Sequence, residues 1–371
     1  MNLFDVYSQY EVDLRKASGL LLTDVNGVNY LDFYGGHGVI SIGHSHPKYI
    51  KAIENQLHQI AFYTNVIKNT LQEELASKLG QVSGYENYNL FLGNSGAEAV
   101  ENALKIASFK TGRSRIIAMN GSFHGRCSGS IAVTDNPSIQ SPFNRWHKVS
   151  FVALNDFEAL EKELSGDDVA GIIIEGIQGV GGVYEGSHEF LKKVRELATA
   201  KGTLMILDEI QSGYGRTGKF FAHQDAEIKP DLITVAKGMG NGFPISGVLI
   251  SPDIQAKKGM LGTTFGGNHL ACAAAISVLD VIKEEKLIEN AAQIGQFLKN
   301  ELKKLNFIKD VRGRGLMIGI EMENAAEFRK RLIYEKHIFT GFSGPNTIRL
   351  LPPLNISIAE AKNFIEILKS L

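Results

Sequence analysis

Two apolar runs, each predicted to be a buried strand, lead into groups that can do chemistry together. Thr203–Asp208 finishes on an aspartate, and Asp231–Val235 is followed two positions later by Lys237. Ligands of a parallel sheet sit outside the carboxyl ends of its strands, so both side chains are expected at one edge. Asp208 alone could be a helix cap or a surface ion pair, and Lys237 alone could extend into solvent. Together they predict an amine nucleophile beside a carboxylate.

This pair of groups suits pyridoxal phosphate (PLP), a cofactor that needs both. Lys237 would form a Schiff base with it, and Asp208 would keep its ring nitrogen protonated so that the ring accepts electrons. Removal from water would lower the pKa of the lysine. The phosphate would find a cradle at Ser95-Gly96-Ala97, because Ser95 and Glu98 have the spacing of a capping box at a helix start. An ordinary capped helix would explain that spacing equally well.

Two arginines could hold the carboxylates of a substrate, since a guanidinium binds a carboxylate through two parallel hydrogen bonds. Arg126 follows Phe123 in a predicted loop, where a solvated arginine is also expected. Arg349 stands in the apolar run Thr347–Pro353. It is either an edge-strand arginine that faces solvent or a buried cation that needs an anionic partner. Phe123 itself could stack on a flat cofactor or belong to the core.

The elements that would position these groups are short runs rich in Ile, Val and Leu, alternating with helical patterns. The runs are Arg115–Met119, Ala170–Glu175, Thr203–Asp208, Asp231–Val235 and Ser246–Ile250. They predict an α/β fold with a parallel sheet covered on both faces.

After this region the alternation of predicted strands and helices gives way to mainly helical patterns. Helical patterns at His269–Glu284 and Glu289–Leu305, followed by a predicted strand at Gly315–Glu321, indicate a second, smaller α+β unit. Near the start of the chain, Asn26-Gly27 between apolar stretches predicts a β-hairpin.

Composition removes several classes of protein. The chain of 371 residues carries 39 basic and 40 acidic groups, which argues against a nucleic-acid partner or a polybasic membrane surface. No apolar run approaches the ~18 residues that a membrane helix needs. Cys127 and Cys272 form no CxxC pair, so neither a disulfide framework nor a zinc site is indicated. We expect a cytoplasmic protein.

A glycine-rich loop and three histidines offer competing interpretations. Gly213–Gly218 matches GxGxxG and, with Lys219, most of a Walker A loop, but Phe220 stands where that loop has Ser or Thr. A nucleotide-binding protein is therefore the alternative outside PLP chemistry. The histidines within residues 37–46 fit no helical ligand spacing, so we expect no metal.

The chain resembles the class III (subgroup II) aminotransferases in six ordered motifs over nearly its whole length. The motifs are Asn94-Ser-Gly-Ala-Glu-Ala99, Phe123-His-Gly-Arg126, Asp208-Glu-Ile-Gln211, Arg216-Thr-Gly218, Lys237-Gly-Met-Gly-Asn-Gly-Phe-Pro244 and Thr264-Phe-Gly-Gly-Asn268. The resemblance implies the PLP-dependent transferase fold type I, with a large domain around a mainly parallel seven-stranded sheet, and a homodimer with active sites at the interface. It implies an N-terminal segment, 1–45, joining the small domain, a large PLP-binding domain, 46–262, and a C-terminal small α+β domain, 263–371.

The resemblance also assigns roles, with Lys237 and Asp208 catalytic. The cofactor-binding residues would be Ser95, Gly96, Ala97, Phe123, His124, Asp208, Gln211, Lys237 and Thr264. The substrate-binding residues would be Arg126, Arg349, His37, Tyr63 and Glu175. Phe123 would stack on the ring, Gln211 would contact its 3′-hydroxyl, and Thr264 would reach the phosphate bound by the other subunit.

Within the family, the chain is most similar to acetylornithine aminotransferases of arginine biosynthesis. This implies transfer of the δ-amino group of N2-acetylornithine, or N2-succinylornithine, to 2-oxoglutarate, giving the semialdehyde and glutamate. Arg126 would bind the donor's α-carboxylate, and Arg349 a carboxylate of 2-oxoglutarate. Val180 replaces a glutamate that covers the second arginine in relatives, and His269 replaces a proline. Ornithine δ-aminotransferase, 4-aminobutyrate aminotransferase, and a PLP aminomutase or decarboxylase are the alternatives.

Overall fold

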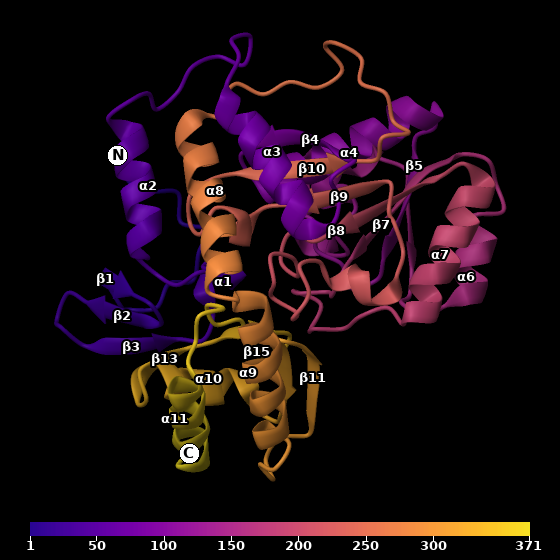
Figure 1. The fold of residues 1–371 in the computed structure, drawn as a ribbon. Coiled ribbons are helices and arrows are strands. Elements are labelled where there is room, and N and C mark those ends of the chain that lie inside the picture. The colour runs from indigo at the N-terminus through magenta and orange to yellow at the C-terminus, as the bar shows by residue number, and fades with distance from the viewer.

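The computed structural model describes residues 1–371 and has a large sheet with helices on both faces and a smaller body below it (Figure 1). The strands of the large sheet are β4 (Asn89–Gly93), β5 (Arg115–Met119), β6 (Val149–Val152), β7 (Val169–Glu175), β8 (Leu204–Asp208), β9 (Leu232–Val235) and β10 (Ser246–Ile250). Their order is β4-β10-β9-β8-β7-β5-β6, and only β10 runs against its neighbours. The predicted, mainly parallel seven-stranded sheet is confirmed.

Helices cover both faces of this sheet, which explains why its strands are apolar almost throughout. α4 (Gly96–Thr111) packs on one face, and α6 (Phe157–Glu163) with α7 (His188–Lys201) packs on the other. In β8, Ile206 joins the core under α4, while Met205 and Leu207 join the opposite core. Because side chains alternate along a strand, a strand buried on both faces stays apolar until it ends.

The smaller body combines segments from both ends of the chain. Its first sheet contains β1 (Leu14–Ser18), β2 (Leu21–Asp24), β3 (Asn29–Asp32) and β13 (Ile338–Phe339). Its second contains β11 (Asp310–Arg314), β12 (Met317–Glu321), β15 (Thr347–Leu350) and β14 (Gly341–Ser343). Its helices are α9 (Leu287–Leu302), α10 (Ala325–Tyr334) and α11 (Ile358–Lys369). The antiparallel pairing of β2 with β3 confirms the predicted hairpin.

Domain limits remain a proposal, and two observations bear on them. β13 pairs in parallel with β3, which supports joining residues 1–45 to the small domain. α8 (His269–Glu284), whose bounds match the prediction, packs on α2 (Pro47–Leu57) and α3 (Thr70–Ser83), both of which belong to the proposed large domain. That packing favours a boundary after α8 rather than after residue 262.

The glycine-rich loop Gly213–Gly218 is filled by protein groups at the junction of the two bodies. Arg216 is buried and donates to the carbonyls of Leu316 and Pro352, and burial lowers its pKa to about 10. A side chain at Gly218 would collide with Ala292 of α9. Protein groups thus surround this loop, which disfavours the nucleotide-binding alternative.

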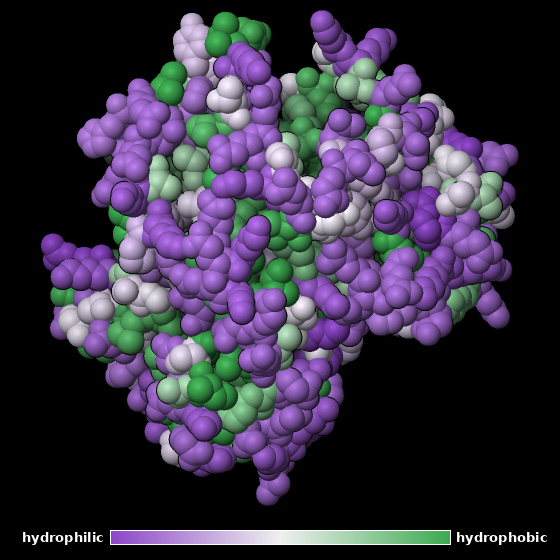
Figure 2. Space-filling view, in the orientation of Figure 1, coloured by the Kyte–Doolittle hydropathy of each residue, from purple (hydrophilic) through white to green (hydrophobic).

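The surface gives no sign of a membrane span. None of the helices combines the length and apolar character needed to cross a bilayer. The face shown in Figure 2 is mostly hydrophilic, with hydrophobic residues in small patches, as is usual for the exterior of a folded chain.

Candidate active site

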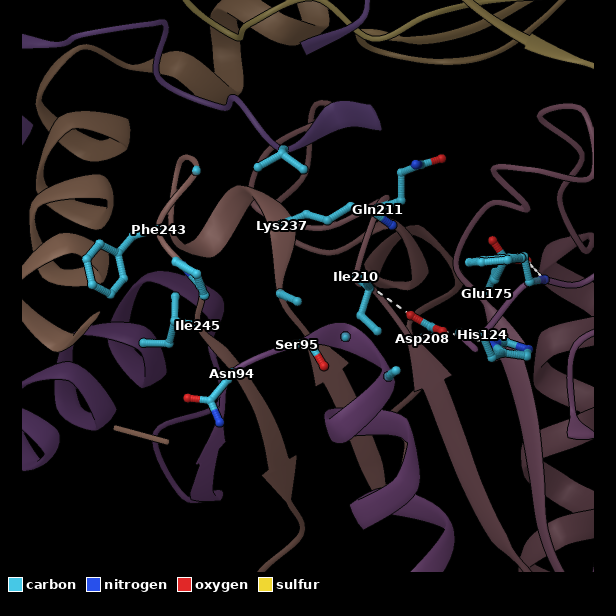
Figure 3. Close-up of a pocket in the computed structure, with 18 residues that line it drawn as sticks. Asn94, Ser95, His124, Glu175, Asp208, Ile210, Gln211, Lys237, Phe243 and Ile245 are labelled. Atoms are coloured by element: carbon cyan, nitrogen blue, oxygen red, sulfur yellow. Dashed lines mark hydrogen bonds and ion pairs between the residues drawn. The ribbon is translucent and has the colours of Figure 1, made fainter. Parts of the chain in front are cut away.

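Three adjacent parallel strands deliver charged groups to one cavity. β7 ends at Glu175 and β8 at Asp208, which are direct neighbours in the sheet, and Lys237 follows the end of β9. All three line a cavity of about 300 Å³ (Figure 3). Lys237 adopts a left-handed backbone conformation (φ 43°), which is strained for a residue with a side chain. The fold thus brings the predicted acid and amine together at the carboxyl edge of the sheet.

Burial shifts the proton affinity of the lysine and of the neighbouring glutamate. It lowers the pKa of Lys237, although Asp208 and Glu175 act in the opposite direction. Burial raises the pKa of Glu175, whose oxygens accept the N–H groups of Phe123 at 3.0 Å and Gly179 at 2.8 Å. A lysine with a lowered pKa has more of its neutral, nucleophilic form near neutral pH.

Asp208 is held by a histidine that is itself incompletely bonded. Its Oδ2 lies 2.7 Å from Nδ1 of His124, and its Oδ1 accepts the N–H of Ile210 at 3.0 Å. Nε2 of His124 is buried and has no hydrogen-bond partner. Buried polar atoms normally find partners, so an unpaired one beside a cavity points to a group from outside the chain.

An anion site opens at the start of α4. Ser95 caps this helix by accepting the N–H of Glu98 at 3.2 Å. The Glu98 carboxylate reaches back to the N–H of Asn94 at 2.7 Å, one residue earlier than the predicted capping box requires. The first N–H groups of a helix lack carbonyl partners one turn earlier, so those of Gly96 and Ala97 remain available. The helix dipole favours a negative group there.

The groups around the cavity fit PLP. An amine, a carboxylate, a helix start that suits a phosphate and the aromatic residue Phe123 all line one cavity. The predicted residues that line it are Ser95, Gly96, Ala97, Phe123, His124, Glu175, Asp208, Gln211 and Lys237.

Four predicted residues lie on the surface of the single chain instead. They are His37, Tyr63, Arg126 and Thr264. Exposure of Thr264 and Tyr63 suits the expectation that a partner subunit completes the site. The sequence analysis missed several lining residues, namely Val39, Asn94, Ile210, Gly242, Phe243, Pro244 and Ile245. Asn94, Ile210, Gly242, Phe243 and Pro244 stand inside the ordered motifs, which was the available signal. Val39 and Ile245 lie outside the motifs and carried none.

Arg349 is buried inside the smaller body and does not face solvent. β15 lies between β12 and β14, and the side chain is 3% exposed, so the edge-strand alternative is wrong. The guanidinium donates to the Phe342 carbonyl at 2.9 Å, the Gln211 amide oxygen at 3.3 Å and the Tyr34 hydroxyl at 3.3 Å. None of these partners is a carboxylate, and burial lowers the arginine's pKa. A buried cation with only neutral partners is suited to bind an anion.

The other two histidines near the N-terminus have structural partners. His44 lies 2.8 Å from Asp32, and His46 lies 3.0 Å from Glu285. No group of three or more His, Cys, Asp or Glu side chains is placed to hold a metal ion.

Comparison with known proteins adds to this geometry. Residues 5–371 match the model of the family "Aminotransferase class-III". The sequence is 38% identical to the acetylornithine aminotransferase of Archaeoglobus fulgidus over 370 residues, 99% of this chain and 97% of that protein. The ornithine aminotransferase of Toxoplasma gondii, solved with partial occupancy of PLP at its active site, superposes with a TM-score of 0.91 at 31% identity, covering 98% of this chain and 90% of that one. The acetylornithine aminotransferase of Elizabethkingia anophelis gives 0.86 at 32% identity, with 98% and 94% covered.

Proposed function

The chain belongs to the class-III aminotransferases, which use pyridoxal phosphate, and we propose that it transfers the δ-amino group of an N2-acylornithine to 2-oxoglutarate. The products would be the N-acylglutamate semialdehyde and glutamate, in arginine biosynthesis. The observation that carries the proposal is a pair of arginines without acidic partners beside the lysine-bearing cavity. Arg126 and Arg349 both lie close enough to His37 to lower its pKa.

The residues of this chain divide the work of the reaction. Bound PLP would supply the electron sink for the carbon that loses its proton. Lys237, kept partly neutral by burial, would take a proton from the substrate carbon and return it to the product. Asp208, oriented by His124, would hold the ring nitrogen protonated. The N–H groups at the start of α4 would hold the phosphate.

Substrate recognition follows from the two arginines. Arg126 would bind the α-carboxylate of the donor, leaving its δ-amine at the reacting position. Arg349 would bind a carboxylate of 2-oxoglutarate. His37, Tyr63 and Glu175 would complete the substrate pocket. The acyl group is left open between acetyl and succinyl, and free ornithine and 4-aminobutyrate are the alternative donors.

We also propose a homodimer that completes each active site across its interface. Exposed apolar side chains support this, since Phe265, which follows Thr264, is 60% exposed and Tyr63 is 57% exposed. The rings of Phe62 and Phe265 lie 5.3 Å apart, which extends this surface. Such exposed groups are typical of an interaction surface. The low cysteine content suits a reducing compartment, and we expect the protein to be cytoplasmic.

The test is a panel of amine donors assayed with 2-oxoglutarate, with glutamate as the measured product. N-acetylornithine, N-succinylornithine, free ornithine and 4-aminobutyrate would be compared by kcat/KM. We expect one acylornithine to exceed both free amines. Preference for free ornithine or 4-aminobutyrate would overturn the acylornithine assignment, and absence of glutamate with every donor would favour an aminomutase or decarboxylase.

A further inference from the structure

Arg349 is surrounded by neutral groups, at a place where the resemblance to the family implies a glutamate. At the position of that glutamate stands Val180, whose side chain is 44% exposed and can neither accept a hydrogen bond nor carry charge. Its carbonyl accepts the hydroxyl of Ser343. The guanidinium instead meets an amide oxygen of Gln211 and the hydroxyl of Tyr34, each at 3.3 Å. The side chains that Arg349 contacts through hydrogen bonds are therefore both neutral.

The hydroxyl of Tyr34 forms hydrogen bonds with both Arg349 and His37. A guanidinium only donates, so the Tyr34 oxygen accepts from Nη2 of Arg349. The Tyr34 hydroxyl also forms a hydrogen bond with Nδ1 of His37, and it donates its proton there when Nε2 carries the ring proton of a neutral histidine. Burial raises the pKa of Tyr34 and lowers that of His37, with Arg349, Lys237, Arg329 and Arg126 adding to the effect on the histidine. Both groups therefore stay neutral near neutral pH.

The backbone is shaped to hold this arrangement. The turn α1 (Gly35–Gly38) is left-handed, and His37 is its only residue with a side chain (φ 69°). Glycine adopts that conformation at little cost, whereas a histidine is strained there, and strain of this kind is maintained where a side chain has a task. The His37 carbonyl also accepts the amide of Gln211 at 2.9 Å.

Two glycines make room for the neutral partners. Gly341 lies opposite Arg349 in the pairing of β14 with β15, and a side chain there would overlap the Tyr34 ring. A side chain at Gly179 would overlap the amide of Gln211. Each neutral group thus occupies a niche that any larger residue would close.

We propose that Tyr34, held by His37, is a positioning residue that aims Arg349 at the carboxylate of the oxo-acid and keeps its hydrogen bond to the guanidinium while that carboxylate is bound. The inference rests on the proposed role of Arg349 as the receptor of 2-oxoglutarate. A neutral hydroxyl fixes the direction of the guanidinium without neutralising it. The arginine is then available in both halves of the reaction with no ion pair to break.

The experiment measures the two half-reactions of the holoenzyme separately for Tyr34→Phe. We expect kcat/KM for 2-oxoglutarate to fall about threefold to tenfold, through KM, because one hydrogen bond that orients the receptor is lost. The half-reaction of the best donor from the panel should change much less. The affinity for glutarate, a dicarboxylate with no oxo group, should fall by the same factor, which reads carboxylate binding without chemistry.

Tyr88→Phe is the matched control, because its hydroxyl makes one neutral bond to the Pro230 carbonyl and neither residue lines the cavity. His37→Gly removes the imidazole while a glycine keeps the left-handed turn, so the fold should survive. If His37 acts on Arg349 only through Tyr34, the double variant Tyr34→Phe/His37→Gly should lose no more glutarate affinity than Tyr34→Phe alone. If the losses of glutarate affinity in the two single variants add up in the double variant, His37 does not act through Tyr34.

The outcomes separate this proposal from the assignment it rests on. If wild-type enzyme fails to react with 2-oxoglutarate or glutamate, the proposed function itself is wrong. If wild type reacts, and Tyr34→Phe binds glutarate as well as or better than wild type, Tyr34 does not position Arg349. A loss shared equally by both half-reactions would also overturn the proposal, because it indicates general damage to the pocket.

Discussion

Two consecutive acids, Asp208 and Glu209, each pair with a buried histidine, yet the two pairs are not equivalent. Asp208 meets Nδ1 of His124 at 2.7 Å, and Glu209 meets Nδ1 of His223 at the same distance. Both acids are buried, at 4% and 1% exposure. Sequence position, chemistry and distance are thus matched, and only the surroundings differ.

The second pair is fully bonded within the chain, and the first is not. Glu209 also accepts from the Ser212 hydroxyl at 2.5 Å and from two backbone N–H groups at 3.0 Å, and Nε2 of His223 meets the Tyr85 hydroxyl at 2.6 Å. Asp208 has one local backbone donor besides His124, and Nε2 of His124 has no partner. A closed polar network stabilises a fold, whereas an open one beside a cavity is available to a ligand.

The largest expected effect is on the open pair. Asp208→Asn should lower turnover at least a hundredfold, about 3 kcal/mol in activation free energy, because the ring nitrogen loses its anionic partner. The unfolding temperature should change little. Steady-state kinetics with a parallel thermal melt would check both, and near-normal turnover would show that this carboxylate is only structural.

The closed pair should respond in the opposite way. Glu209→Gln should lower the free energy of unfolding by about 2–3 kcal/mol, because donors that met a charged acceptor lose it. Turnover per folded molecule should stay close to that of wild type. Denaturant titration together with active-site counting would measure the two quantities. A stable but inactive variant would mean that the two acids are not functionally distinct.

A third substitution would give an acidic partner to Arg349, which has none within the chain. Val180→Glu would give Arg349 a carboxylate within the chain, which 2-oxoglutarate would then have to displace. We expect a loss of about 1–3 kcal/mol in kcat/KM for 2-oxoglutarate, well above any loss for the amine donor. Stopped-flow traces of each half-reaction would show this. No change in either would mean that residue 180 does not reach the arginine.

The smallest effect is expected from a substitution that removes one hydrogen bond from the fully bonded pair of Glu209 and His223. Tyr85→Phe leaves Nε2 of His223 without its partner and should cost about 1 kcal/mol of stability. The values of kcat and KM should not change, because the Tyr85 hydroxyl contacts His223 and neither residue lines the cavity. A comparison of urea midpoints would detect the shift. A change in KM instead would connect this network to the site.

The sequence by itself determined the sheet and the groups at its edge. Strands buried on both faces stay apolar, so the first charge after a run marks its end, and this located Asp208 and Lys237. The runs Arg115–Met119 and Ser246–Ile250 have the same bounds in the structure. The ordered motifs predicted the cofactor and the family, since they record which residues follow which strand.

Only the tertiary structure decided which polar groups remain free. The hydrogen-bond networks of Asp208 and Glu209 cannot be read from the sequence, because their histidine partners lie 84 residues upstream and 14 residues downstream. Arg349 and Tyr34 meet across 315 residues. Whether a polar group finds a hydrogen-bond partner depends on which distant segments the folded core brings together. The pattern of neighbouring residues in the sequence does not predict those contacts. Tertiary packing therefore decides whether a buried acid stabilises the fold or remains available to bind a ligand.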